Sequence, residues 1–331
     1  MSRRDIGTDD PRVRVRPGKG TRPRTKKRPS FDSSHPGFVT EVDRGRFTVV
    51  IPEGTSVMAV KARALGRKGV IVGDRVRLEG DLSGKPGILA RIVTVEERQS
   101  VLRRSFDEGD GGREKQIVAN ATQMLVVVSA ANPAPKRGML DRALVAALHA
   151  GIKPLVAVTK TDLDAAENLV EDYRRIGIAV FTLRRDCYTP DSSALARLKA
   201  VLDGEVTVLL GHSGVGKSTL FNALVPQAQR ATGHVNATTG KGRHTSSSAV
   251  AYPLGSGWVI DTPGLRSFGL AHLSAAQILA GFSELSEIAA GCPRGCTHLN
   301  GSPDCGLDAH PEVATRLASF RKLLGEVTKP Y

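Results

Sequence analysis

Cysteine is scarce in this sequence, with four residues in 331. Three of the four lie within fourteen residues near the end of the chain, an arrangement that argues against disulfides and for a metal site. Long apolar runs are also missing, because no stretch reaches the ~20 residues that cross a bilayer. The first twenty residues lack the apolar core of a secretory signal. We therefore expect a cytoplasmic protein without a membrane partner.

Acidic residues are in the minority, with 33 Asp and Glu against 47 Lys and Arg and a net charge of +14. Residues 1–36 contain eleven Lys and Arg and only four Asp, and they are poor in apolar residues. A segment of this composition is predicted to be a disordered basic tail. It is either a solvated extension or an arm that binds the phosphates of RNA or DNA.

The length of 331 residues predicts two or three domains. Residues 37–100 contain short β-type runs separated by glycine-rich turns, at 47–51, 57–62, 73–78 and 87–95. This spacing predicts a small barrel of the OB-fold type, which often binds oligonucleotides. Aromatic residues are few here, with only Phe38 and Phe47. Recognition of an RNA backbone or shape is therefore favoured over stacking of bases.

Residues 101–116 are charged and rich in glycine, and we interpret them as a linker. From residue 117 to 270 the pattern changes to strands that alternate with helices. Apolar strand runs lie at 123–131, 154–159, 178–183, 205–210 and 258–262, with helical stretches at 139–151 and 167–177. This alternation predicts a parallel sheet covered on both faces, with ligands at the carboxyl ends of the strands.

A phosphate-binding loop follows the strand run at 205–210. The residues fit G-x-x-x-x-G-K-[ST] between a strand and a helix, the context that this motif requires. Backbone N–H groups of such a loop surround phosphates, the lysine bridges the β- and γ-phosphates, and the serine hydroxyl binds Mg²⁺. The predicted nucleotide-binding residues of this loop are Gly211, His212, Ser213, Gly214, Val215, Gly216, Lys217, Ser218 and Thr219.

A D-x-x-G motif follows the strand at 258–262. Asp261 is predicted to hold Mg²⁺, and the N–H of Gly264 is predicted to meet the γ-phosphate. An Asp-Gly pair after a strand is usually only a turn. Its presence together with a phosphate-binding loop makes a GTPase interpretation strong.

The segment Thr159-Lys160-Thr161-Asp162 is similar to the guanine-reading motif N-K-x-D, with Thr159 in place of Asn. The two carboxylate oxygens of Asp162 can accept from guanine N1–H and N2–H₂, whereas adenine offers neither donor there. Lys160 can lay its aliphatic stem along the base. The alternative is a Lys-Asp pair in an exposed turn, and the missing Asn amide leaves the affinity for guanine open.

These motifs occur in the order 159–162, 211–218 and 261–264, so the base motif comes first instead of last. With the preceding barrel, "GKGRHTSSS" at 240–248, "DTPGLRSF" at 261–268 and the C-terminal cysteines, the chain resembles the circularly permuted ribosome small subunit-dependent GTPase A family. The resemblance covers nearly everything from about residue 37. It implies an α/β GTPase domain that follows an OB-fold barrel. A small zinc-binding domain with helices is then expected at residues 271–331.

The resemblance also implies an activity and partners. Family members hydrolyse GTP to GDP with Mg²⁺, faster on the small ribosomal subunit, and act late in its maturation as a checkpoint. The expected partners are therefore GTP, GDP, the small subunit and its rRNA, and we expect a monomer. Thr245 matches a switch residue that senses Mg²⁺ and the γ-phosphate. Leu265 occupies the place of a water-orienting Gln, so another group must act, and His244 is the candidate. The alternative for His244 is a histidine that contacts RNA or is solvated.

The C-terminal cysteines form the pattern C-x₃-C-x-H-x₆-C, in Cys292, Cys296, His298 and Cys305. Three thiolates and an imidazole are a suitable closed set for one structural Zn²⁺. The alternative is a group of small buried side chains with an exposed histidine. Residues 310–327 are predicted to form an amphipathic helix, whose Arg316, Arg321 and Lys322 either meet rRNA or are solvated.

Two other functions remain open on the sequence. One is a P-loop ATPase or kinase, which a preference for ATP over GTP would reveal. The other is an RNA-binding assembly factor that holds nucleotide with negligible hydrolysis.

Overall fold

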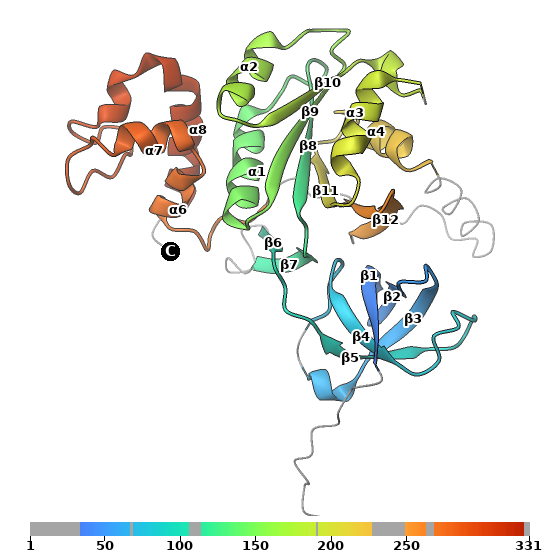
Figure 1. Ribbon diagram of the computed structural model, residues 1–331. Helices are drawn as coiled ribbons and strands as arrows, with labels where there is room; N and C mark the ends of the chain where they lie inside the picture. Colours follow the sequence, from blue (N-terminus) through green and yellow to red (C-terminus); the bar gives the residue numbers. More distant parts are fainter. Residues whose placement is uncertain are drawn as a thin grey trace, which may run out of the picture. The chain divides into compact units, whose positions relative to one another are not determined.

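A computed structural model describes residues 34–66, 69–105, 114–189, 191–226, 249–262 and 268–327 (Figure 1). Nearly all of the predicted basic tail lies outside these ranges. Within them, no helix is both long enough and apolar enough to cross a membrane.

The first part of the described chain is a five-stranded barrel. Its strands are β1 (His35–Asp43), β2 (Arg46–Val50), β3 (Ser56–Lys61), β4 (Arg75–Glu79) and β5 (Ala90–Val95), with a 3-10 turn η1 (Arg63–Leu65) after β3. The order β1-β2-β3-β5-β4 closes because β1 pairs with both β2 and β4. Alternate residues point inward, as Val57 and Ala59 do on β3 and Val76 and Leu78 on β4. The barrel predicted from the spacing of the strands is confirmed.

The segment interpreted as a linker contains regular structure. Strand β6 (Val101–Ser105) pairs antiparallel with β7 (Glu114–Ala119) in a separate two-stranded sheet. Leu102 and Val118 are opposite each other in this sheet and are almost completely buried. The charged, glycine-rich composition hid these two apolar positions. The main α/β sheet begins directly after the hairpin.

The central domain is a parallel sheet that ends in one antiparallel strand, which pairs on its other side with β1 at Glu41 and Val250. Its order is β10-β9-β8-β11-β13-β12, and only β12 runs antiparallel to its neighbour. The strands are β8 (Gln123–Ser129), β9 (Lys153–Thr159), β10 (Ala179–Leu183), β11 (Val206–Gly211), β12 (Val250–Leu254) and β13 (Gly257–Asp261). Every residue of β8 and β11 is buried. Such burial explains the unbroken apolar runs in the sequence.

Helices cover both faces of this sheet (Figure 1). Met124, Val126 and Val128 of β8 pack in one core with α1 (Arg137–His149) and α2 (Glu167–Arg175). The alternate residues Leu125 and Val127 pack in another core with α3 (Ser193–Leu202) and α4 (Lys217–Leu224). A short 3-10 turn η2 (Arg185–Cys187) follows β10. The doubly covered parallel sheet is as predicted.

The C-terminal part is helical. It contains α6 (Ala275–Ala280), α7 (Ser283–Ala289), two 3-10 turns η3 (Gly306–Ala309) and η4 (Pro311–Val313), and α8 (Ala314–Val327). Phe282 and Phe320 meet edge to face with ring centroids 5.5 Å apart, and both are buried. The sequence predicted a helix at 310–327, and its first residues form the turn η4 instead. Proline at the first position of that turn suits its start.

Two of the arginines on α8 are not solvated. Arg316 is buried and pairs with Asp141 and Glu284, and Arg321 pairs with Asp308. Arg98, just after the barrel strands, forms a fork with the buried Asp74, at 2.6 and 2.8 Å. These arginines serve contacts within the chain, so the prediction of a solvated or RNA-facing α8 is wrong for Arg316 and Arg321.

Candidate nucleotide and metal sites

The phosphate-binding loop joins β11 to α4 at the carboxyl edge of the parallel sheet. Gly214 and Gly216 have φ angles of +82° and +88°, which favour glycine. Gly211 is also required, because a Cβ there would lie 2.9 Å from the carbonyl oxygen of Val127. Val215 is buried and anchors the loop. The strand, loop and helix that the motif needs are therefore present, and Ser218 and Thr219 lie in the first turn of α4.

Asp261 lies at the end of β13, next to the phosphate-binding loop. Its carboxylate forms an ion pair with the ammonium group of Lys217. The neighbouring Thr262 donates from Oγ1 to the Leu209 carbonyl, at 2.7 Å, which holds the end of β13 against β11. The predicted phosphate-binding ammonium group and the predicted magnesium-binding carboxylate therefore share one site.

The base motif touches the phosphate-binding loop, although more than fifty residues separate them. Thr159 is buried, and its hydroxyl lies 2.6 Å from the Val215 carbonyl oxygen and 3.2 Å from that of Val128. Lys160 donates from Nζ to the Gly214 carbonyl at 2.8 Å and also to the Asn132 carbonyl. Both residues therefore fix the position of the loop from the end of β9.

The carboxylate of Asp162 is held by one residue, Arg185. The backbone N–H of Arg185 donates to Oδ1 at 2.9 Å, and its Nε donates to Oδ2 at 2.6 Å. The backbone hydrogen bond, followed by that of the guanidinium group, lowers the pKa of Asp162 below its ordinary value. Asp162 is therefore an ionised acceptor, the state that reading guanine N1–H and N2–H₂ requires.

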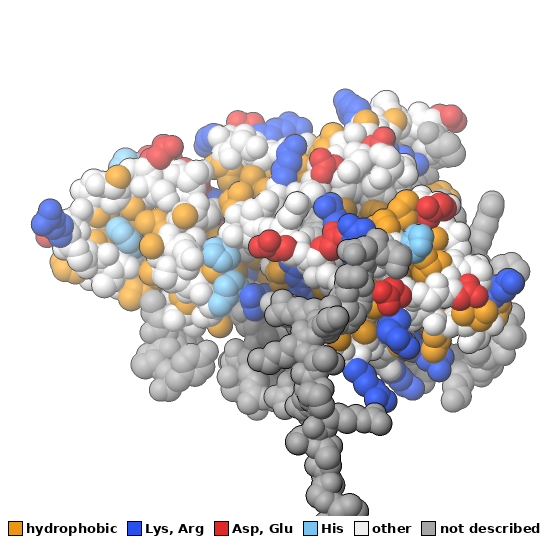
Figure 2. Space-filling view, turned by 60° about the horizontal axis from the view of Figure 1, so that its bottom comes forward, with side chains coloured by type: hydrophobic (Ala, Val, Ile, Leu, Met, Phe, Trp, Pro, Cys, Tyr) orange, Lys and Arg blue, Asp and Glu red, His pale blue; other side chains and the backbone are white. Residues whose placement is uncertain are grey.

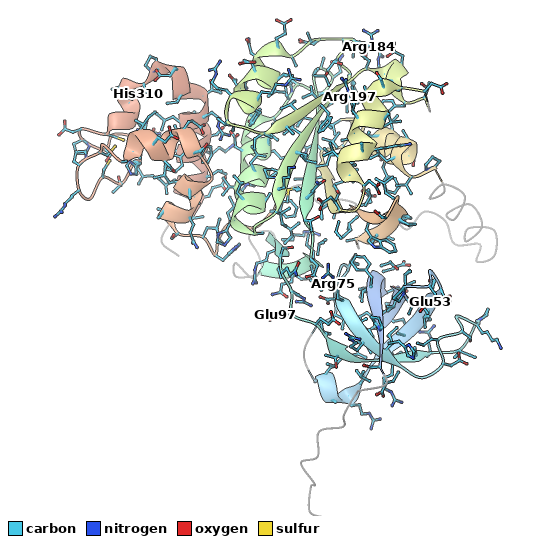
Figure 3. All side chains as sticks on the ribbon, viewed as in Figure 1. Glu53, Arg75, Glu97, Arg184, Arg197 and His310 are labelled. Carbon is cyan, nitrogen blue, oxygen red and sulfur yellow. The ribbon has the colours of Figure 1, made fainter. Side chains whose placement is uncertain are left out.

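Arg185 is a residue of the candidate site that sequence reasoning did not name. It lies just beyond Arg184, which follows β10 at the carboxyl edge of the sheet (Figure 3). The one signal for it in the sequence is its position just after a strand of the parallel sheet, because the contact of Arg185 with Asp162 spans 23 residues and depends on strand pairing.

A small cavity of about 290 Å³ adjoins the phosphate-binding loop. It lies between that loop and the segment from the end of β8 to the start of α1. Most of the groups that line it are apolar, and its lining residues from the loop are His212, Ser213 and Val215. Two candidate switch residues, His244 and Thr245, and the pair Gly264 and Leu265 lie outside the described residues, so their roles stay predictions.

The four candidate metal ligands come together in the C-terminal part. One ligand atom from each of Cys292, Cys296, His298 and Cys305 lies within 4.8 Å of all the others. His298 Nδ1 is 3.4 Å from the sulfur of Cys296 and 3.7 Å from that of Cys305. A tetrahedral Zn²⁺ with Zn–S of ~2.3 Å and Zn–N of ~2.0 Å sets its ligand atoms about 3.5–3.8 Å apart. The donor set and its spacing therefore fit a structural metal ion.

Hydrogen bonds reach two of the sulfurs in the cluster, and the surroundings act in opposite directions on the pKa of Cys296 and of Cys305. The Gly306 N–H donates to Cys292 Sγ at 3.2 Å. A hydrogen bond with Ser302 lowers the pKa of the Cys296 thiol, and burial raises that of Cys305. His310, labelled in Figure 3, lies outside the cluster and contacts Glu312 at 2.7 Å. Cys292 is therefore part of the same group as the other three residues.

Comparison with known sequences identifies the family. A sequence model described as RsgA GTPase matches residues 95–271. The small ribosomal subunit biogenesis GTPase RsgA of Bordetella pertussis (strain Tohama I) is 38% identical over 309 residues, which cover 89% of this chain and 98% of the relative. The protein of the same name from Azotobacter vinelandii (strain DJ) is 35% identical over 273 residues, covering 79% and 76%. The chain belongs to the RsgA GTPase family.

Solved structures confirm the fold of this family member. YloQ, described as a circularly permuted GTPase, has a TM-score of 0.66 at 23% identity and covers 92% of this chain and 99% of its own. YjeQ from Thermotoga maritima has a TM-score of 0.68 at 22% identity, covering 90% and 100%. The predicted family, the permuted fold and a GTP-hydrolysing activity are thus confirmed. Like GTPases in general, an RsgA GTPase depends on Mg²⁺.

Proposed function

We propose that this GTPase acts in biogenesis of the small ribosomal subunit. It binds the subunit and its rRNA in the cytoplasm as a monomer, and the subunit stimulates hydrolysis late in maturation. The relatives named for this role support the proposal, because alignment with one of them extends over 98% of its length. The observation that carries the enzymatic part is the contact of all three motifs, through Lys160 with Gly214 and Lys217 with Asp261.

The described residues divide the work on GTP. Asp162 accepts from the edge of guanine, and Lys160 covers the base plane. Residues 211–216 offer backbone N–H groups to the phosphates, followed by Ser218 and Thr219 of α4. Lys217 leaves Asp261 to bind the β- and γ-phosphates. Bound Mg²⁺ supplies positive charge that offsets charge developing on the γ-phosphate, and Ser218, Thr245 and Asp261 are the residues that would hold it.

Hydrolysis needs a group that orients water. Leu265 offers no hydrogen bond, so we assign this role to His244, with Thr245 and Gly264 as sensors of the γ-phosphate. His244→Ala is expected to keep GDP affinity and to lower subunit-stimulated turnover by about 10²–10⁴-fold. Stopped assays of phosphate release, with a GDP titration beside them, measure both quantities. Unchanged stimulated turnover would exclude His244.

The barrel offers a basic face for rRNA. Among the residues of the barrel that the structure describes, the exposed charged ones are seven basic and four acidic: Arg44, Arg46, Arg63, Arg75, Arg77, Lys85 and Arg91 against Asp43, Glu53, Asp81 and Glu97. Figure 2 shows Lys and Arg side chains on one face of the molecule, mixed with acidic ones. The basic tail, residues 1–36, adds more positive charge. Binding through these groups weakens as the salt concentration rises.

We assign the cluster Cys292, Cys296, His298 and Cys305 to one structural Zn²⁺. Its ligands draw together a part of the chain that contains little regular structure, residues 290–309. Bound metal stabilises such a loop by holding ligands that are far apart in the unfolded chain.

Phosphate release from GTP, measured with and without purified small subunits, tests the proposed function. We expect strong stimulation by subunits and none with Lys217→Ala, which keeps the fold but loses the phosphate-binding ammonium group. Binding to subunits without stimulated hydrolysis would favour an assembly factor instead. A preference for ATP would favour the ATPase interpretation and contradict the role of Asp162.

A further inference from the structure

Arg321 of α8 contacts two of the four residues in the cysteine and histidine cluster. Its Nε donates to the backbone carbonyl of His298 at 3.0 Å, and its Nη2 lies 3.9 Å from the sulfur of Cys305. The side chain is 11% exposed. These contacts join residues 16 and 23 positions apart, so Arg321 links both halves of the loop to the helix.

Asp308 fixes the orientation of Arg321. Its two carboxylate oxygens accept from Nη1 at 2.6 Å and from Nη2 at 2.8 Å. This two-point fork locks the plane of the guanidinium group, leaving Nε for His298 and an Nη2 hydrogen for sulfur. The planar guanidinium group of Arg321 thus contacts Asp308, the carbonyl of His298 and the sulfur of Cys305 at once.

The backbone at His298 needs such support. Its φ angle is +56°, in the left-handed region that a side-chain-bearing residue adopts at a cost of about 1 kcal/mol or more. This conformation directs the imidazole toward the sulfurs of Cys296 and Cys305. A hydrogen bond to the carbonyl of the same residue stabilises the conformation.

The net charge of the metal site is a second reason to expect a cationic side chain beside it. Three thiolates and a divalent ion together carry one net negative charge. A cationic donor near a thiolate lowers the electrostatic cost of keeping that charge within the folded chain.

We propose that Arg321 is a positioning residue of the metal site, which holds Cys305 and the His298 backbone in ligand geometry and offsets the charge of the thiolates. The inference rests on the proposed Zn²⁺ site and assigns α8 a role in it. Residues that orient metal ligands in this way change metal affinity by about 10–100-fold when they are removed.

The test is the affinity of the full chain for Zn²⁺, measured by competition with a chelating dye under reducing conditions. Arg321→Met is expected to weaken binding by about 10–100-fold. Arg294→Met is the matched control, because Arg294 is an exposed arginine in the same loop, and it is expected to change affinity by less than about threefold. Arg321→Lys keeps the charge without the fork, and its Zn²⁺ affinity is expected to lie between those of Arg321→Met and Arg294→Met.

A second variant keeps the test decisive if Arg321→Met does not fold. Asp308→Asn replaces one oxygen of the fork and is expected to weaken Zn²⁺ binding in the same direction by a smaller factor. Co²⁺ binding adds a spectroscopic readout, since a lost thiolate contact changes its sulfur-to-metal charge-transfer band. Equal Zn²⁺ affinity and equal Co²⁺ spectra in wild type and all Arg321 and Asp308 variants would overturn the role of Arg321 and leave the metal site itself standing. A wild-type chain that binds no Zn²⁺ would overturn the metal site as well.

Discussion

Thr159 shows what the first residue of the base motif does in this chain. An Asn amide is absent, yet the Thr159 hydroxyl lies within hydrogen-bond distance of carbonyl oxygens on β8 and on the phosphate-binding loop. One hydroxyl hydrogen serves both acceptors, and the shorter distance is to Val215. The residue therefore holds the loop that surrounds the phosphates, while selection of the base falls to Asp162.

Thr159→Val tests this division of roles. Valine keeps the shape but leaves the buried Val215 carbonyl without its donor, at a cost of about 1–3 kcal/mol in unfolding free energy. We expect GDP affinity to fall about tenfold, while the preference for GDP over ADP is kept. Urea unfolding and nucleotide titration measure the two effects. Thr159→Ser keeps the hydroxyl and serves as the control, so an equal loss with Ser would contradict the role of this hydrogen bond.

The ion-pair partners of several charged residues could not be predicted from the sequence. The motifs predicted the phosphate-binding loop, Asp261 and the metal cluster, because their chemistry depends on local spacing. Arg316 and Arg321 looked like surface cations, since a sequence shows charge but not partners. Arg316 finds Asp141 across 175 positions, and no local pattern marks such a pair.

At the scale of elements, α8 is held against α1 and α2 by a buried charged centre. Arg316 donates to Asp141 of α1 and, at 2.7 Å, to Glu284 of α7. Tyr173 of α2 donates from its hydroxyl to Asp141 at 2.7 Å. The guanidinium group also lies 4.4 Å from the centre of the Phe282 ring, near enough for a cation–π contact. The helix thus reaches α1, α2 and α7 through one side chain.

Asp141→Ala is expected to lower the unfolding free energy by about 3–5 kcal/mol, because it leaves the Arg316 charge buried without this partner. Chemical denaturation measures the loss. The double variant Asp141→Leu with Arg316→Met is expected to regain part of it, since no fully buried charge then remains, although Glu284, which is 21% exposed, loses its partner.

An exposed ion pair provides the control. Glu171 and Arg175 are 63% and 65% exposed, and Arg175→Ala is expected to change stability by less than about 0.5 kcal/mol. A loss for Asp141→Ala no larger than this would show that the centre contributes nothing to holding α8.

The β6–β7 hairpin is the element that sequence reasoning missed. Its charged residues Arg103, Arg104, Glu114 and Lys115 suggested a linker, whereas its buried residues are Leu102, Val118 and Ala119. Strand β12 was also missed, because Pro253 interrupts its apolar pattern. The pairing of β12 with β1 is at Val250, so at Pro253 only the β13 side is paired, and a proline is tolerated there. Central strands, buried on both faces, were predicted within one or two residues.

At the scale of the whole molecule, the permuted order places the barrel and hairpin before the first strand of the α/β sheet. Gly73 lies where barrel and hairpin meet. Its N–H donates to the carbonyl of Val39 of β1 at 2.9 Å, and its own carbonyl accepts from the Asn120 side chain at 2.9 Å. A Cβ at this position would lie 2.0 Å from the Ala119 carbonyl oxygen. Only a glycine therefore fits at position 73.

Gly73→Ala is expected to cost about 2–5 kcal/mol, from a collision with backbone added to a φ of +89°. Gly45→Ala isolates the cost of the positive φ angle, since Gly45 has a φ of +83° and a Cβ there would meet nothing within 4 Å. For this variant we expect a loss of about 1 kcal/mol in unfolding free energy. Denaturant unfolding compares the two variants. Equal losses would mean that the close approach of barrel and hairpin carries no energetic weight.

The central claim is that residues 159–162, 211–218 and 261, though permuted in order, form one guanine nucleotide site. The direct test is the nucleotide preference of Asp162→Asn. An Asn side chain accepts from N1–H and donates to the C2 carbonyl of xanthine, which replaces the amino group of guanine. We predict that wild type prefers GDP to XDP and that Asp162→Asn reverses the preference by at least about tenfold. A variant that still prefers GDP would contradict the site.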